Sequence, residues 1–233
     1  MKNLNIFSSV ANYENAKLTG ILNVPNVSFI NELGNIICLP KPDFTHNGYE
    51  YVDLGLPSGL KWATCNVGAN SPEEYGLYFA WGETTGYTGE QVTSGVRMFD
   101  RASYTASSIS ADLTLEQDAA HVNLGGNWRM PTKAEYQELI DNCDITWVSN
   151  YKDKGIAGYL FTSKINRNSV FFPAAGYGND SYVPAAPTAG NYWSASWYSS
   201  SDAMEFGFTY NYFSLGTGST SRHFGESVRG VCK

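Results

Sequence analysis

The fold class is decided by residues 132–143, TKAEYQELIDNC. Thr132 followed by Glu135 forms a capping box, in which the hydroxyl and the carboxylate satisfy free backbone N–H groups at a helix start, an effect worth about 1 kcal/mol. The apolar residues that follow recur at helical spacing and share one face: Tyr136, Leu139, Ile140 and Cys143. We therefore expect an amphipathic helix that begins at Thr132 and packs on a core.

Outside this helix the sequence is typical of short strands joined by long loops. Alternating or continuous apolar runs predict strands at 49–54, 60–65, 78–81, 159–162, 169–172, 191–196, 203–208 and 227–232. The other segments are a short helical turn at 71–74, a long polar surface loop at 84–111, a short helix at 115–122 and a Gly/Pro/Ala loop at 173–190. This order predicts an α+β domain with small antiparallel sheets, one or two helices and long loops, with Trp193 and Phe206 in the core.

The first 45 residues differ from the rest. Two apolar runs, 27–30 and 36–39, flank a turn that contains Gly34, which predicts a β-hairpin. We interpret residues 1–45 as an appendage for attachment or homo-oligomerisation, and residues 46–233 as the main domain. The alternative is that the two strands belong to the main domain.

Composition and charge exclude several classes of partner. The net charge is −7, and no run of Lys or Arg occurs, which argues against nucleic acid and against an anionic membrane surface. No apolar stretch approaches the ~20 residues that span a bilayer, so we expect no membrane insertion. No signal peptide is visible at the start, so either a leader was removed or none was used.

The four cysteines form no metal or redox motif. No CxxC pair occurs among them, since they stand at Cys38, Cys65, Cys143 and Cys232. If all four were oxidised, three disulfide connectivities would be possible. Buried free thiols are favoured over disulfides, because a chain of 233 residues can build a sufficient core without cross-links.

Several blocks of sequence resemble one family. The blocks are residues 53–69 (DLGLPSGLKWATCNVGA), 71–83 (SPEEYGLYFAWGE) and 126–132 (GNWRMPT), with Tyr192-Trp-Ser194 and Ser227-Val-Arg229. They are similar to the Fibrobacter succinogenes major paralogous domain. The resemblance runs from about residue 49 to 232. It implies a C-type-lectin-like fold, found in surface and secreted proteins of Bacteroidetes-type bacteria, in which the terminal strands and long loops form a ligand face. Some proteins of this fold are retroelement-diversified receptor binders, including phage tail tips. The family pattern also implies structural salt bridges for Arg222 and Arg229.

No arrangement of residues indicates catalysis. The three histidines are far apart in sequence, and no GxSxG elbow, phosphate loop or dinucleotide fingerprint occurs. Residues 129–136 resemble the helix entry of formylglycine-generating-type proteins, but Cys143 and Cys232 do not match the cysteine pair of those enzymes. The calcium-binding triplets of C-type lectins are also missing. We therefore expect no catalytic residue, metal or cofactor, with a formylglycine-generating-like enzyme as the alternative.

Surface recognition is the remaining interpretation. Residues 197–202 and 209–221 combine Tyr, Trp, Ser, Gly and Asn, the residue types that antibody binding loops favour. The predicted ligand residues are Tyr177, Tyr182, Trp197, Tyr198, Asp202, Tyr210, Asn211, Tyr212 and His223. The sequence thus predicts a non-catalytic adhesion protein, at a cell surface or on a virion, that binds a glycan or protein receptor. A phage tail-tip or pilus-tip subunit is the alternative within this class.

Overall fold

The computed structural model describes residues 28–30, 36–38, 44–210 and 215–233. Its contacts divide the chain into two compact units, Met1–Phe44 and Thr45–Lys233. In the first unit, β1 (Ser28–Ile30) and β2 (Ile36–Cys38) pair antiparallel, as the hairpin prediction required. The proposed attachment role of residues 1–45 stays a prediction.

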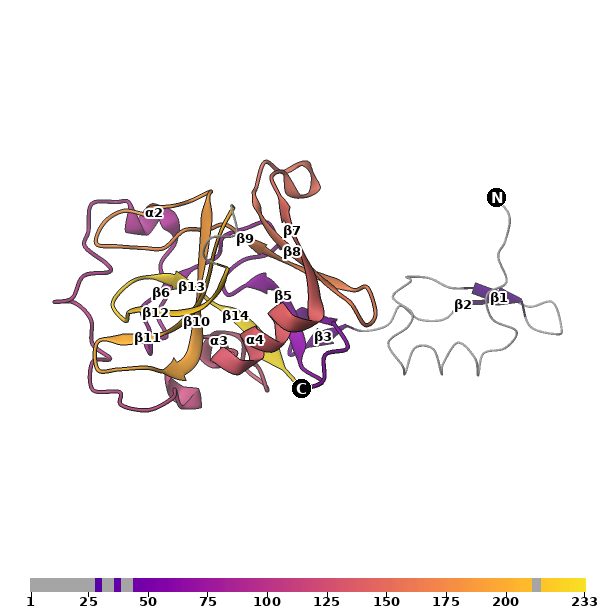
Figure 1. The fold of residues 1–233 in the computed structure, drawn as a ribbon, viewed down its shortest axis with the longest axis horizontal. Coiled ribbons are helices and arrows are strands. Elements are labelled where there is room, and N and C mark those ends of the chain that lie inside the picture. Colours follow the sequence, from indigo (N-terminus) through magenta and orange to yellow (C-terminus); the bar gives the residue numbers. More distant parts are fainter. Residues whose placement is uncertain (1–27, 31–35, 39–43, 211–214) are drawn as a thin grey trace. The chain divides into compact units, whose positions relative to one another are not determined.

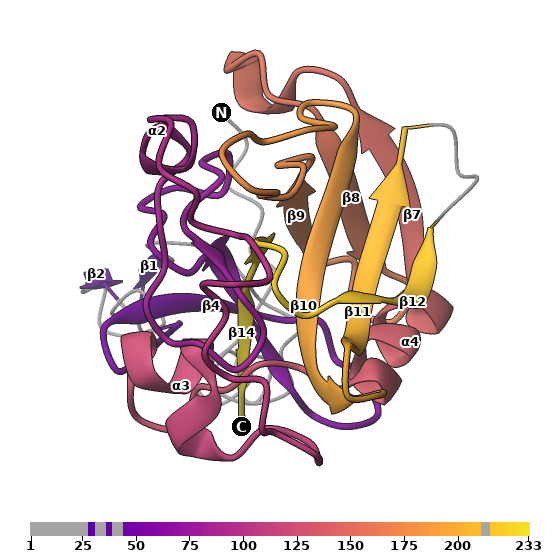
Figure 2. The same ribbon diagram turned by 90° about the vertical axis from the view of Figure 1, so that its left-hand side faces the viewer.

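The second unit is an α+β fold made mostly of strands with few short helices, as predicted. Its strands are β3 (Thr45–His46), β4 (Tyr49–Asp53), β5 (Lys61–Asn66), β6 (Tyr78–Phe79), β7 (Cys143–Val148), β8 (Gly158–Ser163), β9 (Ser169–Pro173), β10 (Ala189–Trp197), β11 (Asp202–Thr209), β12 (Gly216–Ser221), β13 (Glu226–Ser227) and β14 (Arg229–Cys232). Its helices are α2 (Gly89–Val92), α3 (Ala119–Leu124) and α4 (Lys133–Asn142), with 3₁₀ turns η1 (Leu115–Gln117) and η2 (Tyr151–Asp153). Figures 1 and 2 show this arrangement.

The strands form three sheets. Their orders are β12-β11-β10-β13-β6, β14-β5-β4-β3 and β7-β8-β9. All of these pairs are antiparallel except β10 with β13, so the prediction of purely antiparallel sheets is wrong at this one position. The parallel pair arises because the chain makes two further strands, β11 and β12, before it returns to the other side of β10. A long connection of this kind is what a parallel pair requires.

The largest hydrophobic core lies between α4 and strands of all three sheets. Tyr136 from α4 stacks on Phe206 from β11 with ring centroids 4.9 Å apart, and Phe172 and Tyr192 complete the aromatic cluster. α4 lies against β11 and β12 (Figure 2). Phe206 in this core and Trp193 in a second cluster are fully buried, as predicted.

Several local predictions are wrong in detail. Cys143 does not continue the helix: it has extended backbone angles and begins β7, because β7 pairs along its length with β8 and the sheet hydrogen bonds replace the helical ones. Residues 71–74 form a turn without a helix, in which the Glu74 N–H donates to the Ser71 carbonyl. β7 and β12 were not predicted, and the predicted helix at 115–122 is two short pieces, η1 and α3.

The predicted salt bridges of Arg222 and Arg229 are also wrong, because neither side chain forms an ion pair within the described part of the chain. Both are buried. Arg229 uses all five N–H groups on neutral acceptors, namely the Asn66 side chain and the carbonyls of Ala63, Thr64 and Phe171. Arg222 lies over the Trp81 ring at 4.7 Å and donates to the Ser199 carbonyl.

Candidate functional site

A groove of about 940 Å³ lies between the solvent-facing side of α4 and the turn that joins β10 to β11. It is lined by Asp112, Thr132, Lys133, Ala134, Gln137, Glu138, Asp141, Asn142, Ser196, Trp197, Tyr198 and Met204. Three separate parts of the chain therefore build it: the loop before η1, the helix α4, and the β10–β11 hairpin.

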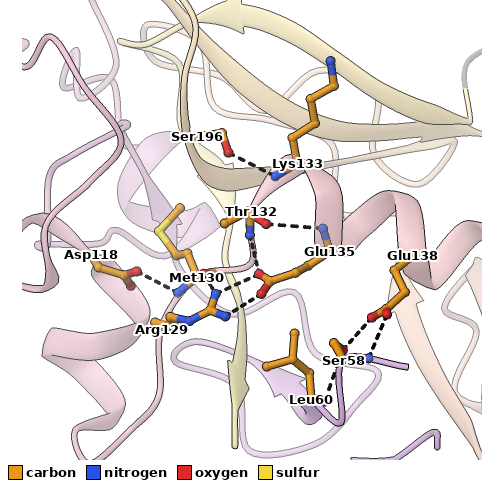
Figure 3. Close-up of polar contacts among 10 residues, drawn as sticks. All are labelled: Ser58, Leu60, Asp118, Arg129, Met130, Thr132, Lys133, Glu135, Glu138 and Ser196. Carbon is orange, nitrogen blue, oxygen red and sulfur yellow. Dashed lines mark hydrogen bonds and ion pairs between the residues drawn. The ribbon is translucent and has the colours of Figure 1, made fainter. Parts of the chain in front are cut away.

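A polar network fixes the start of α4 beside β10 (Figure 3). The Thr132 hydroxyl accepts from the Glu135 N–H, and the Glu135 carboxylate accepts from the Thr132 N–H at 2.7 Å, as the capping box predicted. Arg129 donates to both oxygens of Glu135, at 2.8 and 2.5 Å. The Lys133 N–H donates to the Ser196 hydroxyl of β10, which joins the helix start directly to the other wall of the groove.

A second contact holds the middle of the helix. Both oxygens of the Glu138 carboxylate accept hydrogen bonds from Ser58, one from its N–H at 2.9 Å and one from its hydroxyl at 2.6 Å (Figure 3). Glu135 and Glu138 are therefore bound to structural partners. Neither is placed as a general acid.

The aromatic wall of the groove is formed by Trp197 and Tyr198, whose exposed fractions are 37% and 55%. The Trp197 N–H donates to Asp112 Oδ1 at 2.7 Å, so the loop before η1 braces the backbone that presents both rings. Exposed aromatic rings held on a braced backbone provide contact area at low entropic cost.

The opposite wall is polar. On α4, Gln137 donates to Asp141 Oδ1 at 2.9 Å, and both side chains are exposed. With Lys133 and Asn142 they give the groove a row of hydrogen-bond donors and acceptors opposite the two rings. A polar helix face is usually a solvated surface, so no pattern in the sequence marks these residues as part of a site.

The structure does not bring the predicted ligand residues together. Tyr210 follows β11 at the opposite end from Trp197, is exposed, and has its ring centroid 6.3 Å from that of Trp147. β10 has nine residues, so eight residue-to-residue steps separate its two ends, which corresponds to roughly 26 Å. Asp202 accepts hydrogen bonds from Ser199, Ser201 and Ser221, which gives it a role in closing the hairpin turn.

A third group lies around Phe224. The rings of Tyr177 and His223 have their centroids 5.4 and 4.7 Å from that of Phe224, and both residues are partly buried. Burial lowers the pKa of His223, because it disfavours the charged form of the imidazole. Tyr182 is exposed and accepts from Asn179. The predicted residues Asn211 and Tyr212 lie outside the described residues.

The thiols of the described chain are free, as predicted. Cys143 and Cys232 are buried, and burial raises the pKa of each to about 11. Cys65 is only partly buried, and the side chain of Cys38 lies outside the description. A thiol with a raised pKa is a poor nucleophile at neutral pH, because the thiolate is the reactive form.

Two features are absent from the part of the chain that the structure describes. No group of three or more His, Cys, Asp or Glu side chains comes together there as a metal site. No helix there has the length and apolar character to cross a membrane.

Comparison of the chain with protein-family models, with curated proteins and with solved structures finds no match.

Proposed function

We propose that this chain is a non-catalytic binding protein that recognises a glycan through the groove between α4 and the β10–β11 turn. The observation that carries the proposal is the pair of exposed rings, Trp197 and Tyr198, facing a row of polar side chains on a fixed helix. Sugar rings have apolar faces that lie on aromatic rings, and their hydroxyls bond to side chains such as Gln137 and Asp141. A concave site with aromatic contact and a few placed polar groups is typical of small-ligand recognition.

The electrostatics of the groove favour a neutral or cationic ligand. Asp112, Glu138 and Asp141 outnumber Lys133 among its lining residues, and the whole chain carries a net charge of −7. An acidic polysaccharide or a nucleic acid would meet like charge there. A neutral glycan is therefore the preferred class within this proposal, and a protein receptor is the second.

The fold is proposed to be C-type-lectin-like and related to the Fibrobacter succinogenes major paralogous domain. Two features support this. The last strand, β14, pairs with β5, so the end and the beginning of the second unit meet in one sheet, and the long segment between β6 and η1 contains little regular structure. A place at a bacterial surface or on a virion, including a phage or pilus tip, is proposed together with that relationship.

The enzymatic alternative finds less support. Among the described thiols, Cys143 and Cys232 are buried and have high pKa values, so at most Cys65, which is partly buried in β5, is accessible. A formylglycine-generating-like reaction would need a reactive cysteine pair. The groove itself contains no cysteine and no histidine.

Binding of the full chain to an array of immobilised glycans, and to bacterial cells, tests the proposal. The double substitution Trp197→Ala/Tyr198→Ala is expected to weaken binding at least tenfold, since rigid aromatic anchors often contribute 1 kcal/mol or more each. Tyr210→Ala, which removes an equally exposed ring at the other end of β11, is the matched control and is expected to bind as the wild type does. Loss of binding in the control alone would move the site to the Tyr210 end. Retained binding in both variants would remove the aromatic groove from recognition.

A further inference from the structure

Two glutamates meet on one face of the five-stranded sheet. Glu205 on β11 is the antiparallel partner of Trp193 on β10, so their side chains point to the same face. Ser227 on β13 is the parallel partner of Tyr192, and both point to the opposite face. Glu226, one residue earlier on β13, therefore points to the face of Glu205. The two acids lie on either side of β10, which runs between β11 and β13 (Figure 1).

The carboxyl groups of Glu205 and Glu226 form a hydrogen bond with each other across β10. An ionised carboxylate can only accept hydrogen bonds, so a hydrogen bond between two carboxyl groups requires a proton on one of them. Two carboxylates in contact also repel each other, which favours the state with one proton bound. The contact therefore implies one bound proton for the pair.

The surroundings place that proton on Glu226. Its side chain is 1% exposed and lies beside Phe79, its buried partner on β6. No donor group of the described residues reaches its Oε2 atom, as an ionised carboxylate would need. Glu205 is only partly buried, and its Oε2 atom accepts from Asn191 Nδ2 at 2.9 Å, which stabilises the ionised form. Burial first, and Glu205 second, raise the pKa of Glu226 well above its ordinary value.

Positive charge does not compensate the pair. Within the described part of the chain, no Lys, Arg or His side chain forms an ion pair with Glu205 or Glu226. The two arginines nearest in sequence are used elsewhere. Arg222 lies over the Trp81 ring, and Arg229 donates to carbonyls of β5 and β9. A second negative charge on the pair would thus lack a partner, which is costly for a buried group.

The other elements around Glu226 contribute neutral side chains. β6 brings Phe79, and β10 brings Asn191 and Trp193. On the other face, α4 brings the hydroxyl of Tyr136, which stays neutral because burial raises its pKa well above the ordinary value. The charged group that acts on the proton of Glu226 is therefore Glu205.

The two acids differ in their access to water. A hollow of about 380 Å³ adjoins Glu205, and Gly207, Gly216 and Gly218 are among its lining residues. A Cβ atom at Gly207 or Gly218 would stand 3.7 or 3.8 Å from Glu205 Oε1, so the absent side chains leave space around this oxygen. Glu205 can turn into the hollow, whereas Glu226 is enclosed.

We propose that Glu205 and Glu226 form a pH-sensitive link, in which one shared proton holds β11 to β13 across β10. When hydroxide removes the proton at alkaline pH, the O–H···O hydrogen bond is lost and the two carboxylates repel each other. Glu205 then turns toward the hollow, and the paired strands β11 and β12 loosen from β13. The O–H bond of Glu226 is the one covalent bond that breaks, and its proton leaves as water. The proposal does not depend on the glycan groove.

Stability is expected to fall as the pH rises. The folded state keeps a proton that the unfolded chain releases above about pH 4.3, the ordinary pKa of a glutamate. The stabilising contribution of this proton is complete below that pH and is lost as the pH rises toward the raised folded pKa. Over this window, the link makes the equilibrium constant of unfolding rise about tenfold for each pH unit.

Infrared spectroscopy of the full chain detects the proton directly, because an un-ionised carboxyl group has a C=O stretching band apart from the bands of a carboxylate. At pH 7 the wild type is expected to show such a band, which the folded Glu226→Gln variant lacks. Comparison of the two proteins removes the contribution of any other protonated acid, such as the buried Asp118. Identical carboxyl bands in both proteins would overturn the proposal.

Urea denaturation from pH 5 to pH 8 measures the effect on stability. Glu226→Gln has a neutral donor at every pH, so it is expected to match the wild type near pH 5 and to be more stable than the wild type at pH 8. The ratio of the two unfolding constants should grow by up to about tenfold per pH unit. Glu205→Gln, which replaces the repelling charge by an amide, is expected to reduce the pH dependence.

Glu90→Gln, which removes an exposed carboxylate on α2, is the matched control, and its unfolding constant should keep a constant ratio to that of the wild type. A constant ratio for folded Glu226→Gln would show that Glu226 binds no extra proton in the folded state, and the link would not exist. If Glu226→Gln does not fold, Glu205→Gln takes its place in the infrared comparison. An amide beside Glu226 permits its ionisation, so the carboxyl band should then weaken, and an unchanged band would contradict the shared proton.

Discussion

At the scale of single residues, the buried arginines differ most from what the family pattern implied, because they form hydrogen bonds to neutral groups instead of salt bridges. Burial lowers the pKa of Arg229 because it disfavours the charged form, but the guanidinium is surrounded by five neutral hydrogen bonds and the face of Phe172, 4.5 Å away. Those acceptors belong to two strands: β5, which ends at Asn66, and β9. One side chain thus ties the last strand to two others.

Arg229→Met is therefore expected to lower the free energy of unfolding by about 3 kcal/mol or more, because it leaves buried acceptors such as Asn66 Oδ1 without donors. Arg167→Met, which removes an exposed ion pair with Asp144, is the control and should change stability by less than about 0.5 kcal/mol. Urea denaturation measures both. A loss for Arg229→Met as small as that of the control would show that the hydrogen bonds of Arg229 contribute little net stability.

At the scale of elements, α4 shows how local signals and tertiary contacts combine. The capping box sets its first residue, while Ser196, Arg129 and Ser58 fix its position against the sheets and so form the groove. Burial alone would raise the pKa of Glu135, but hydrogen bonds from Arg129 and Thr132, with the charge of Arg129, lower it overall. The Glu135 carboxylate thus favours the folded state when it is ionised.

The ionised Glu135 carboxylate makes the stability of the protein depend on pH. Since the folded pKa of Glu135 lies below its unfolded value, its contribution is present at neutral pH and is lost as the pH falls through the folded pKa. Glu135→Gln is expected to cost about 1–2 kcal/mol at pH 7, because the partly exposed ion pair is screened, and progressively less at acid pH. Denaturation curves from pH 7 to pH 3 measure this difference, with Glu90→Gln on the exposed side of α2 as the control. A difference that does not shrink at acid pH would rule out the ionised carboxylate as its source.

At the scale of the whole molecule, the two ends of the second unit meet in one sheet. β14 pairs with β5 through Arg229 with Asn66 and Val231 with Trp62, and Val231 also exchanges backbone hydrogen bonds with Arg129. Val231 and Trp62 are fully buried. The last residues of the chain are therefore an internal part of the core, whereas residues 1–44 form a separate compact unit.

Two truncations test this organisation. Removal of residues 229–233 is expected to abolish cooperative thermal unfolding, because it takes away the buried strand β14 and the Arg229 hydrogen bonds. Removal of residues 1–44 is expected to leave the melting temperature of the second unit within a few degrees of that in the full chain. Calorimetry distinguishes the two, and a large destabilisation by the N-terminal truncation would contradict the independence of the units.

The sequence by itself determined the α+β class, the start of α4, most strands and the core positions of Trp193 and Phe206. These depend on capping and on the alternation of apolar residues, which involve residues close in the chain. Only the tertiary structure decided the parallel β10–β13 pair and the environment of Arg229, which contains no salt bridge. It also decided the strand β12, because the residues Gly-Thr-Gly-Ser-Thr-Ser carry no apolar pattern. It also decided the candidate sites: Trp197 and Tyr198 were expected from their residue types, but Asp112, Gln137 and Asp141 join them only because distant segments pack together. The physical reason is that a site is a juxtaposition in space, and side chains far apart in sequence leave no periodic signal of where they meet.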